Sequence, residues 1–202
     1  MIGVIDYGMG NIHSVLKALE HLGAKAIIAD NGDKVKGCDK LVFPGVGAFE
    51  DAVLELKERR LIDPILKGIG EKKIFLGICL GMQLLFEKSQ EASKASGLGV
   101  LKGDVRKFPS RKGLKVPHMG WNQLKIVQSA CPLLKGVAEG SYVYFCHSYY
   151  PQLKEPGLIA AGCDYGIEFA CVVSSGNVFG VQFHPEKSQE TGLQILKNFV
   201  EM

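Results

Sequence analysis

The stretch KKIFLGICLGMQLLFEK, residues 72 to 88, joins an apolar run to a run of helical periodicity through a single cysteine, Cys79. Gly77 and Gly81 stand two residues to either side of it. Small residues at these positions allow a sharp turn, in which neighbouring backbone segments come close together. The stretch therefore predicts a buried strand, a tight turn at Cys79 and a helix over residues 80–88.

Apolar runs and helical patterns alternate through the first 90 residues. Helical spacing begins after Asn11, which we expect to cap a helix over 12–22, and recurs over 48–69, where Pro64 should start a second helical piece. Short apolar runs, which predict strands, cover 2–6, 24–29, 40–44 and 73–78. Buried strands separated by helices favour a parallel sheet with right-handed crossovers.

The second half of the chain has a different pattern. The turn sequence SSGN, residues 174–177, predicts that the strands on either side of it pair antiparallel. A final helix is predicted from Leu193, Leu196, Phe199 and Val200, which share one face. Further strand-like runs cover 143–147, 158–163, 169–175 and 177–183. We expect a single α/β domain over residues 1–202, with an open, mixed and largely parallel sheet flanked by helices and extended by antiparallel strands.

The composition is that of an ordinary globular protein. Of the residues 47% are apolar, and the formal net charge of +3 is too small to indicate nucleic-acid binding. No targeting segment or membrane-length apolar run is evident, so we expect a cytoplasmic protein without membrane contact. None of the six cysteines forms a CxxC pair, so no metal site is expected. We expect every cysteine except Cys79 to be a buried structural thiol.

A glycine-containing turn follows the first predicted strand. The segment DYGMGNIH, residues 6–13, resembles the start of a dinucleotide-binding fingerprint, but His13 stands where the third glycine is required. A bulky side chain there would prevent close packing of helix against strand. The segment is therefore interpreted as a tight turn.

Cys79 fits the nucleophile-elbow template, with cysteine in place of serine. The amides at the start of the predicted helix would point at the sulfur and favour a thiolate, and the amide of Leu80 would be one donor to an oxyanion. A buried structural cysteine is the alternative for this stretch taken alone.

A thiol nucleophile requires a general base, and His184 is the best candidate. It follows a predicted strand and precedes Pro185, whose extended geometry can bring Glu186 back to orient the imidazole. His118 and His147 lie in apolar or aromatic surroundings, which favour structural hydrogen bonding. The segment PGVG, residues 44–47, follows another predicted strand and is either an anion-binding turn or an ordinary one.

Three segments, GICLGMQ (77–83), GVQFHPEKS (180–188) and PGVGAF (44–49), together resemble the class I (triad) glutamine amidotransferases. DYGMGN (6–11), PHMGWN (117–122) and FCHSYY (145–150) are similar, within that family, to the glutaminase subunits of imidazole glycerol phosphate synthase. The resemblance implies a flavodoxin-like amidotransferase fold. Cys146 departs from the family pattern, which more often has an aliphatic residue there.

The resemblance implies roles for individual residues. Cys79 would be the nucleophile, His184 the general base and then acid, and Glu186 its orienting carboxylate. Val46 or Gly47 would supply the second oxyanion amide, beside that of Leu80. Substrate glutamine would be held by Gly45, Gly47, Gln83, His147, Ser148 and Tyr149, and the partner subunit would be contacted by Pro117, His118, Met119, Gly120, Trp121 and Asn122. For the segment 117–122 the alternative is a proline-initiated loop with a buried tryptophan.

The implied reaction is hydrolysis of glutamine to glutamate and ammonia through a thioester on Cys79, without a cofactor. Ammonia would pass to a (β/α)8-barrel cyclase subunit of imidazole glycerol phosphate synthase, in a heterodimer that serves histidine biosynthesis. An amidotransferase subunit that feeds another synthase, for example one that amidinates a surface sugar, is an alternative. A non-catalytic binding subunit on the same fold is another.

Overall fold

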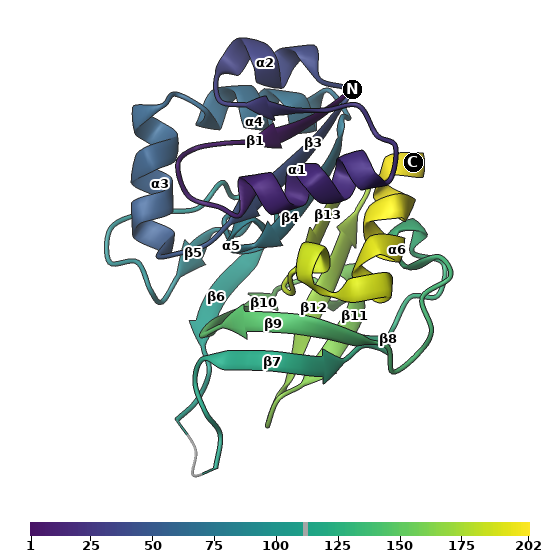
Figure 1. Ribbon diagram of the computed structural model, residues 1–202. Helices are drawn as coiled ribbons and strands as arrows, with labels where there is room; N and C mark the ends of the chain where they lie inside the picture. The colour runs from purple at the N-terminus through teal and green to yellow at the C-terminus, as the bar shows by residue number, and fades with distance from the viewer. Residues whose placement is uncertain (111–112) are drawn as a thin grey trace.

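An eight-stranded sheet runs through the protein (Figure 1), in a computed structural model that describes residues 1–110 and 113–202. Its first five strands are parallel and its last three antiparallel. In spatial order they are β2 (Ala26–Ala29), β1 (Ile2–Ile5), β3 (Lys40–Gly45), β4 (Ile74–Cys79), β13 (Val178–Val181), β12 (Glu168–Ser175), β11 (Ile159–Asp164) and β8 (Lys125–Ile126). The prediction of an open, mixed and largely parallel sheet is therefore confirmed.

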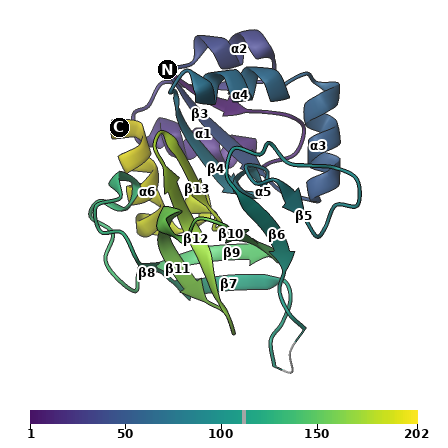
Figure 2. The same cartoon turned by 180° about the vertical axis from the view of Figure 1, so that it is seen from behind.

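Helices cover both faces of the parallel half. α1 (Ile12–His21) and α6 (Gln189–Glu201) pack on one face, and α2 (Gly32–Gly37), α3 (Phe49–Glu58) and α4 (Ile62–Gly70) pack on the other. Figure 2 shows the second face with α4 in front. Each face buries its own cluster of aliphatic and aromatic side chains, and full burial of each such side chain contributes roughly 1.5–3 kcal/mol.

The described residues also form two smaller sheets. β10 (Tyr149–Leu153) pairs with β6 (Gly103–Lys107), which in turn pairs with β5 (Lys88–Ser89). A separate hairpin-like pair joins β7 (His118–Gln123) to β9 (Tyr142–His147), beside α6 in Figure 1. The segment PHMGWN is thus largely a strand, and Trp121 is 46% exposed. The alternative of a loop with a buried tryptophan is wrong.

The helix after Cys79 is shorter than predicted. α5 (Leu80–Gln83) has a single turn, whereas the sequence pattern predicts a helix to residue 88. The carbonyls of the following residues bond to a returning segment instead, with Leu98 donating to Leu84 at 2.7 Å and Leu101 to Leu85 at 2.9 Å. Tertiary pairing therefore replaces the next turn of the helix.

In the part of the chain that the structure describes, three short 3-10 turns occur at Pro132–Leu134, Pro156–Leu158 and Pro185–Lys187. The last of them leads into α6 and carries Glu186. Within residues 1–110 and 113–202, none of the helices combines the length and apolarity that a membrane crossing requires.

Candidate active site

Three loops meet at one edge of the main sheet. The parallel strands β3, β4 and β13 are adjacent, with Gly45 opposite Cys79 and Ile78 opposite Val181. The carboxyl ends of parallel strands lie at the same edge, which is where ligand sites form in open α/β sheets. The turn after β3, Cys79 at the end of β4, and His184 beyond β13 are therefore brought together.

The turn at Cys79 has strained backbone geometry. Its φ of 55° and ψ of −112° lie in a region that residues with a side chain rarely adopt, at a cost of roughly 1–3 kcal/mol. Gly81 permits the turn, because a Cβ there would lie only 1.7 Å from the carbonyl oxygen of Phe43. A Cβ at Gly77 would lie 2.8 Å from the carbonyl oxygen of Gly81. Both glycines are required by close approach of backbone, as the sequence predicts.

His184 is oriented by a buried carboxylate. Its Nδ1 lies 3.0 Å from Oε1 of Glu186, and the two side chains are 5% and 1% exposed. Nδ2 of Asn11 donates to the same Oε1 at 3.3 Å, while Oε2 of Glu186 has no hydrogen-bond partner among the described residues. Asn11 stands at the N-cap position of α1, as predicted, but its side chain makes no capping bond and turns to Glu186 instead.

The environment of His184 favours its charged form. Burial lowers the pKa of the imidazole, but hydrogen bonds with Cys79 and Glu186, together with their negative charges, outweigh burial and raise the pKa to about 10. Because α5 is only one turn long, its helix dipole at Cys79 is small, and the imidazolium of His184 is the positive charge beside the sulfur.

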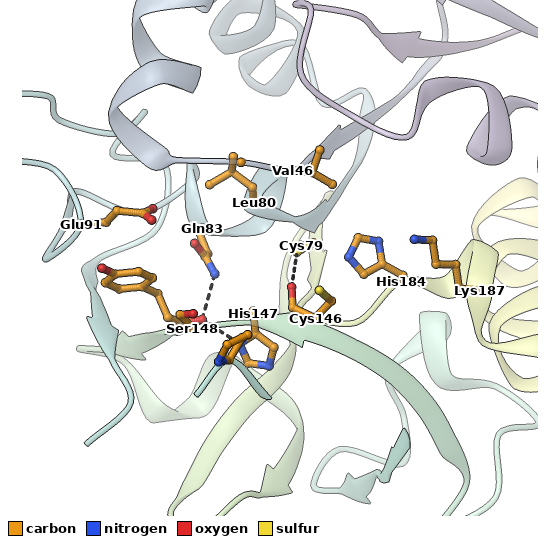
Figure 3. A pocket seen from close by; sticks show the side chains of 13 residues that line it. Val46, Cys79, Leu80, Gln83, Glu91, Cys146, His147, Ser148, His184 and Lys187 are labelled. Atoms are coloured by element: carbon orange, nitrogen blue, oxygen red, sulfur yellow. Dashed lines mark hydrogen bonds between the residues drawn. The ribbon is translucent and has the colours of Figure 1, made fainter. Parts of the chain in front are cut away.

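A pocket of about 310 Å³ opens over Cys79. In Figure 3, Cys79 lies between Gln83 and His184. Most of the pocket lining consists of residues that the sequence analysis selects for the site: Val46, Gly47, Cys79, Leu80, Gln83, Pro117, His147, Ser148, Tyr149 and His184. The lining also includes Glu91, Cys146 and Lys187, to which the sequence analysis gives no role in the site. Gly45 is absent from the lining, and a Cβ there would lie 2.4 Å from the Tyr7 hydroxyl and 2.9 Å from the Gly81 amide nitrogen.

Two glutamines connect the pocket wall to the sulfur. Nε2 of Gln83 donates to the carbonyl of Tyr149 at 2.9 Å and to Oε1 of Gln182 at 3.1 Å. Nε2 of Gln182 in turn lies 3.8 Å from Sγ of Cys79. Gln182 is fully buried and is a site residue that the sequence analysis misses. Its position two residues before His184 is the only signal that could have indicated it.

The two histidines of the strand pair point away from the surface. His118 and His147 are 2% and 6% exposed, and their rings bond to each other in the interior. His118 therefore has no side-chain surface for a partner, unlike Met119 and Trp121, which are 62% and 46% exposed. His147 contributes no free side-chain nitrogen to the pocket.

Cys146 differs from the other cysteines that were expected to be buried. Cys38, Cys131, Cys163 and Cys171 are buried, whereas Cys146 is half-buried and lines the pocket. Its carbonyl oxygen lies 4.0 Å from Sγ of Cys79. The expectation of a buried structural thiol is therefore wrong at this position, because alternate residues of β9 face the core and Cys146 faces the other way.

Comparison with known proteins bears on this site. The family described as "Glutamine amidotransferase class-I" matches residues 3–202. The chain belongs to the class-I glutamine amidotransferase family. Its fold agrees with this assignment, since a crystal structure of a glutamine amidotransferase superimposes with a TM-score of 0.77 at 19% identity, covering 100% of this chain and 99% of the other. PurLQS from Thermotoga maritima gives 0.78 at 20% identity, covering 99% and 97%.

Within this family of amidotransferases the chain is similar to one kind of subunit. It is 52% identical to the imidazole glycerol phosphate synthase subunit HisH of Caldanaerobacter subterraneus, over 100% of this chain and 98% of that protein. The subunit of the same name from Acinetobacter baylyi is 46% identical, over 99% and 97%.

Proposed function

We propose that this class-I glutamine amidotransferase is the glutaminase subunit of an imidazole glycerol phosphate synthase, acting in histidine biosynthesis in the cytoplasm. Residues 1–202 act as one amidotransferase domain. One observation carries the catalytic part: Cys79 sits at a strained strand-to-helix turn, in a pocket that it shares with His184, which is paired with the buried Glu186. The full-length similarity to HisH subunits supports the pathway.

The first half of the reaction follows from these groups. The Cys79 thiolate attacks the carboxamide carbon of glutamine, and the oxygen of that group becomes an oxyanion. His184, which holds its proton through Cys79 and Glu186, gives it to the leaving nitrogen, so that ammonia departs and a glutamyl thioester forms. The neutral imidazole then takes a proton from water, which hydrolyses the thioester to glutamate and restores the thiolate.

Backbone amides and Gln83 complete the site. The amide of Leu80 and an amide of the Val46–Gly47 turn are the oxyanion donors, since both segments line the pocket beside Cys79. Gly47 has a φ of +95°, which lets the turn adopt a conformation that favours glycine. Gln83 and the backbone of His147, Ser148 and Tyr149 form the wall that receives the α-amino acid part of glutamine.

Ammonia needs a protected path to its acceptor, because water would protonate it. The exposed apolar side chains Met119 and Trp121 on β7 and Val46 beside the pocket, which is 42% exposed, are suited to cover by a partner. The partner in this proposal is a (β/α)8-barrel cyclase subunit, which joins the ammonia to a phosphorylated ribulosyl intermediate.

Reconstitution tests this assignment. The chain and a candidate barrel cyclase are expected to copurify and to turn over the cyclase substrate with glutamine as the nitrogen source. Met119→Lys should weaken the complex at least tenfold, whereas Val127→Lys, at a site equally exposed (63%) but outside residues 117–122, should not. Glutamine hydrolysis without association with the cyclase would instead indicate a subunit that feeds another synthase.

Glu186→Gln is expected to shift the pH dependence of glutamine hydrolysis. The carboxylate raises the pKa of His184, so its replacement lowers that pKa from about 10 and the imidazole loses its proton at lower pH. The alkaline limb of kcat/KM against pH should therefore move to lower pH, and the maximal rate should fall roughly 100-fold. The charge pair of His184 and Glu186 also stabilises the folded state. This stabilisation is fully present below the unfolded pKa of His184 and is lost as pH rises through about 10. It should be smaller in Glu186→Gln.

The matched control is Glu190→Gln, which removes an exposed carboxylate from the first turn of α6. Its pH–rate profile, measured by ammonia release in the reconstituted complex, should match the wild type. An unchanged alkaline limb in Glu186→Gln would contradict the role of this carboxylate.

A further inference from the structure

A pair of buried histidines joins strand β7 to the wall of the pocket. Nδ1 of His118 on β7 is 3.1 Å from Nε2 of His147 on β9. The ring of His118 stacks on Phe145 and Tyr165, with centroids 4.6 and 3.8 Å apart and planes within 21° in both cases. The stacking fixes the plane of the His118 ring, so its nitrogens have little freedom to change partners.

The hydrogen bonds at both ends of the pair determine where each proton lies. At one end, Nδ1 of His147 lies 2.7 Å from the carbonyl oxygen of Tyr149, which can only accept, so this nitrogen carries a hydrogen. In a neutral ring Nε2 of His147 is then an acceptor. Nδ1 of His118 must therefore donate to it, and Nε2 of His118 is left as an acceptor.

At the other end of this series of hydrogen bonds, Asn122 provides the donor that Nε2 of His118 requires. Nδ2 of Asn122 lies 3.3 Å from Nε2 of His118 and also donates to the carbonyl of Asp164 at 2.8 Å. The orientation of the Asn122 amide is independently fixed, because its Oδ1 accepts from the amide of Gln123 at 2.8 Å. One assignment satisfies every member, with both rings neutral and both hydrogens on Nδ1. Burial supports it, lowering the pKa of His118 to about 4 and that of His147 to about 3.

The series of hydrogen bonds continues from the histidine pair to the pocket. The Tyr149 carbonyl accepts from His147 on one side and from Nε2 of Gln83 on the other. Gln83 uses its second N–H on Gln182, so its carbonyl oxygen is the part of the side chain left for a ligand. The orientation of the Gln83 amide thus depends on the position of the Tyr149 carbonyl, which His147 holds.

We propose that the buried His118–His147 pair is a positioning element for glutamine, which fixes the Tyr149 carbonyl and through it the amide of Gln83, and thereby ties substrate binding to the position of strand β7. This inference rests on the proposed glutaminase function. Neither histidine touches the reacting atoms. Loss of the pair should therefore weaken glutamine binding more than it slows the chemical step.

Two substitutions at residue 118 separate the hydrogen bond from the packing. His118→Phe keeps a ring between Phe145 and Tyr165 but removes the donor to His147, whereas His118→Asn restores an N–H near the place of Nδ1. In the reconstituted complex, His118→Phe should raise KM for glutamine about tenfold with kcat within threefold, and His118→Asn should recover most of the loss. The same order is expected for glutamine affinity on a Cys79→Ser background, measured by calorimetry.

Tyr165→Phe controls for general destabilisation of the cluster. It removes the bond from the Tyr165 hydroxyl to the carbonyl of Lys115, at 2.7 Å, and leaves the stacked ring in place. KM should not change, even if the thermal stability falls. Equal KM values for His118→Phe and wild type, or equal effects of His118→Phe and Tyr165→Phe, would overturn the proposal.

A measurement on the wild-type chain does not depend on how the variants fold. With ¹⁵N-labelled histidine, NMR at pH 7 should show His118 and His147 as neutral rings protonated at Nδ1, the tautomer that is less common in solution. Protonation at Nε2 of either ring would overturn the proposed series of hydrogen bonds. Loss of activity in Cys79→Ser tests the glutaminase function separately, so failure of one proposal is distinguishable from failure of the other.

Discussion

Cys79→Ala is expected to lower the glutamine-dependent rate of the reconstituted complex at least 1,000-fold, because it removes the thiol that lies beside His184 and forms the thioester. Cys146, the other thiol in the lining, lies on β9 rather than at the strained turn. The rate with added ammonia should persist, since the acceptor chemistry belongs to the partner. Ammonia release and product formation with either nitrogen source provide the measurement.

Cys131→Ala is the matched control for loss of a thiol. Cys131 is buried at the start of a 3-10 turn outside the pocket, and its replacement should leave the glutamine-dependent rate within about threefold. A Cys79→Ala complex that still hydrolysed glutamine at the wild-type rate would eliminate the proposed mechanism and favour a non-catalytic binding subunit.

The strain at residue 79 predicts a further difference between two inactive variants. Cys79→Gly should be more stable than Cys79→Ala by about 1 kcal/mol, because glycine adopts a φ of 55° without the steric cost borne by a residue with a Cβ. Urea denaturation of the two variants measures this difference. The same comparison measures how much the strained backbone at residue 79 lowers the stability of the fold.

Gly81→Ala is expected to destabilise the fold by at least about 3 kcal/mol, and the variant should be largely insoluble or unfolded. The new Cβ would lie 1.7 Å from the carbonyl oxygen and 2.8 Å from the carbonyl carbon of Phe43, on the neighbouring strand. Backbone atoms cannot rotate out of the way as a side chain can. Either β3 or the turn at Cys79 must shift, and both contribute to the active site.

The matched control is Gly70→Ala. Gly70 ends α4, and a Cβ there would meet no atom within 4 Å. Replacing a helical glycine by alanine typically stabilises by roughly 0.5–1 kcal/mol. The soluble yield and the circular dichroism spectrum of Gly81→Ala, and the free energy of unfolding of Gly70→Ala from urea titration, provide the measurements. Equal stability of Gly81→Ala and wild type would contradict the close packing at the turn.

Much of the architecture could be predicted from local pattern. The parallel strands, most of the helices between them and the antiparallel hairpin at residues 174–177 follow from periodicity and turn residues, whereas the helix α2 between β2 and β3 is not predicted. The prediction is wrong for α5, where the apolar pattern continues to residue 88 but the carbonyls bond to residues 97–101. Periodicity records which residues are buried, and a buried turn can share that pattern with a helix.

Some residues of the active site could likewise be predicted from the sequence, and others could not. Cys79, His184 and the turn at residues 44–47 could be selected because each follows a predicted strand and carries a group suited to the chemistry. Asn11 and Gln182 could not, because an amide has many uses and only the meeting of distant segments gives these two theirs. The same holds for His118, whose role depends on its bond to the ring of His147, and for Asn122, whose amide donates to the carbonyl of Asp164.

The sequence by itself determined the glycine-flanked turn that exposes Cys79, because steric limits on a tight turn act between residues close along the chain. It also determined the alternation of strand and helix from which the parallel sheet follows. Only the tertiary structure decided that Asn11 donates to Glu186, that Gln182 lies beside Cys79, and that His118 and His147 are a single bonded pair. Hydrogen-bond partners and burial set the protonation states of the buried histidines, and these partners and this burial arise only when segments far apart in sequence come together.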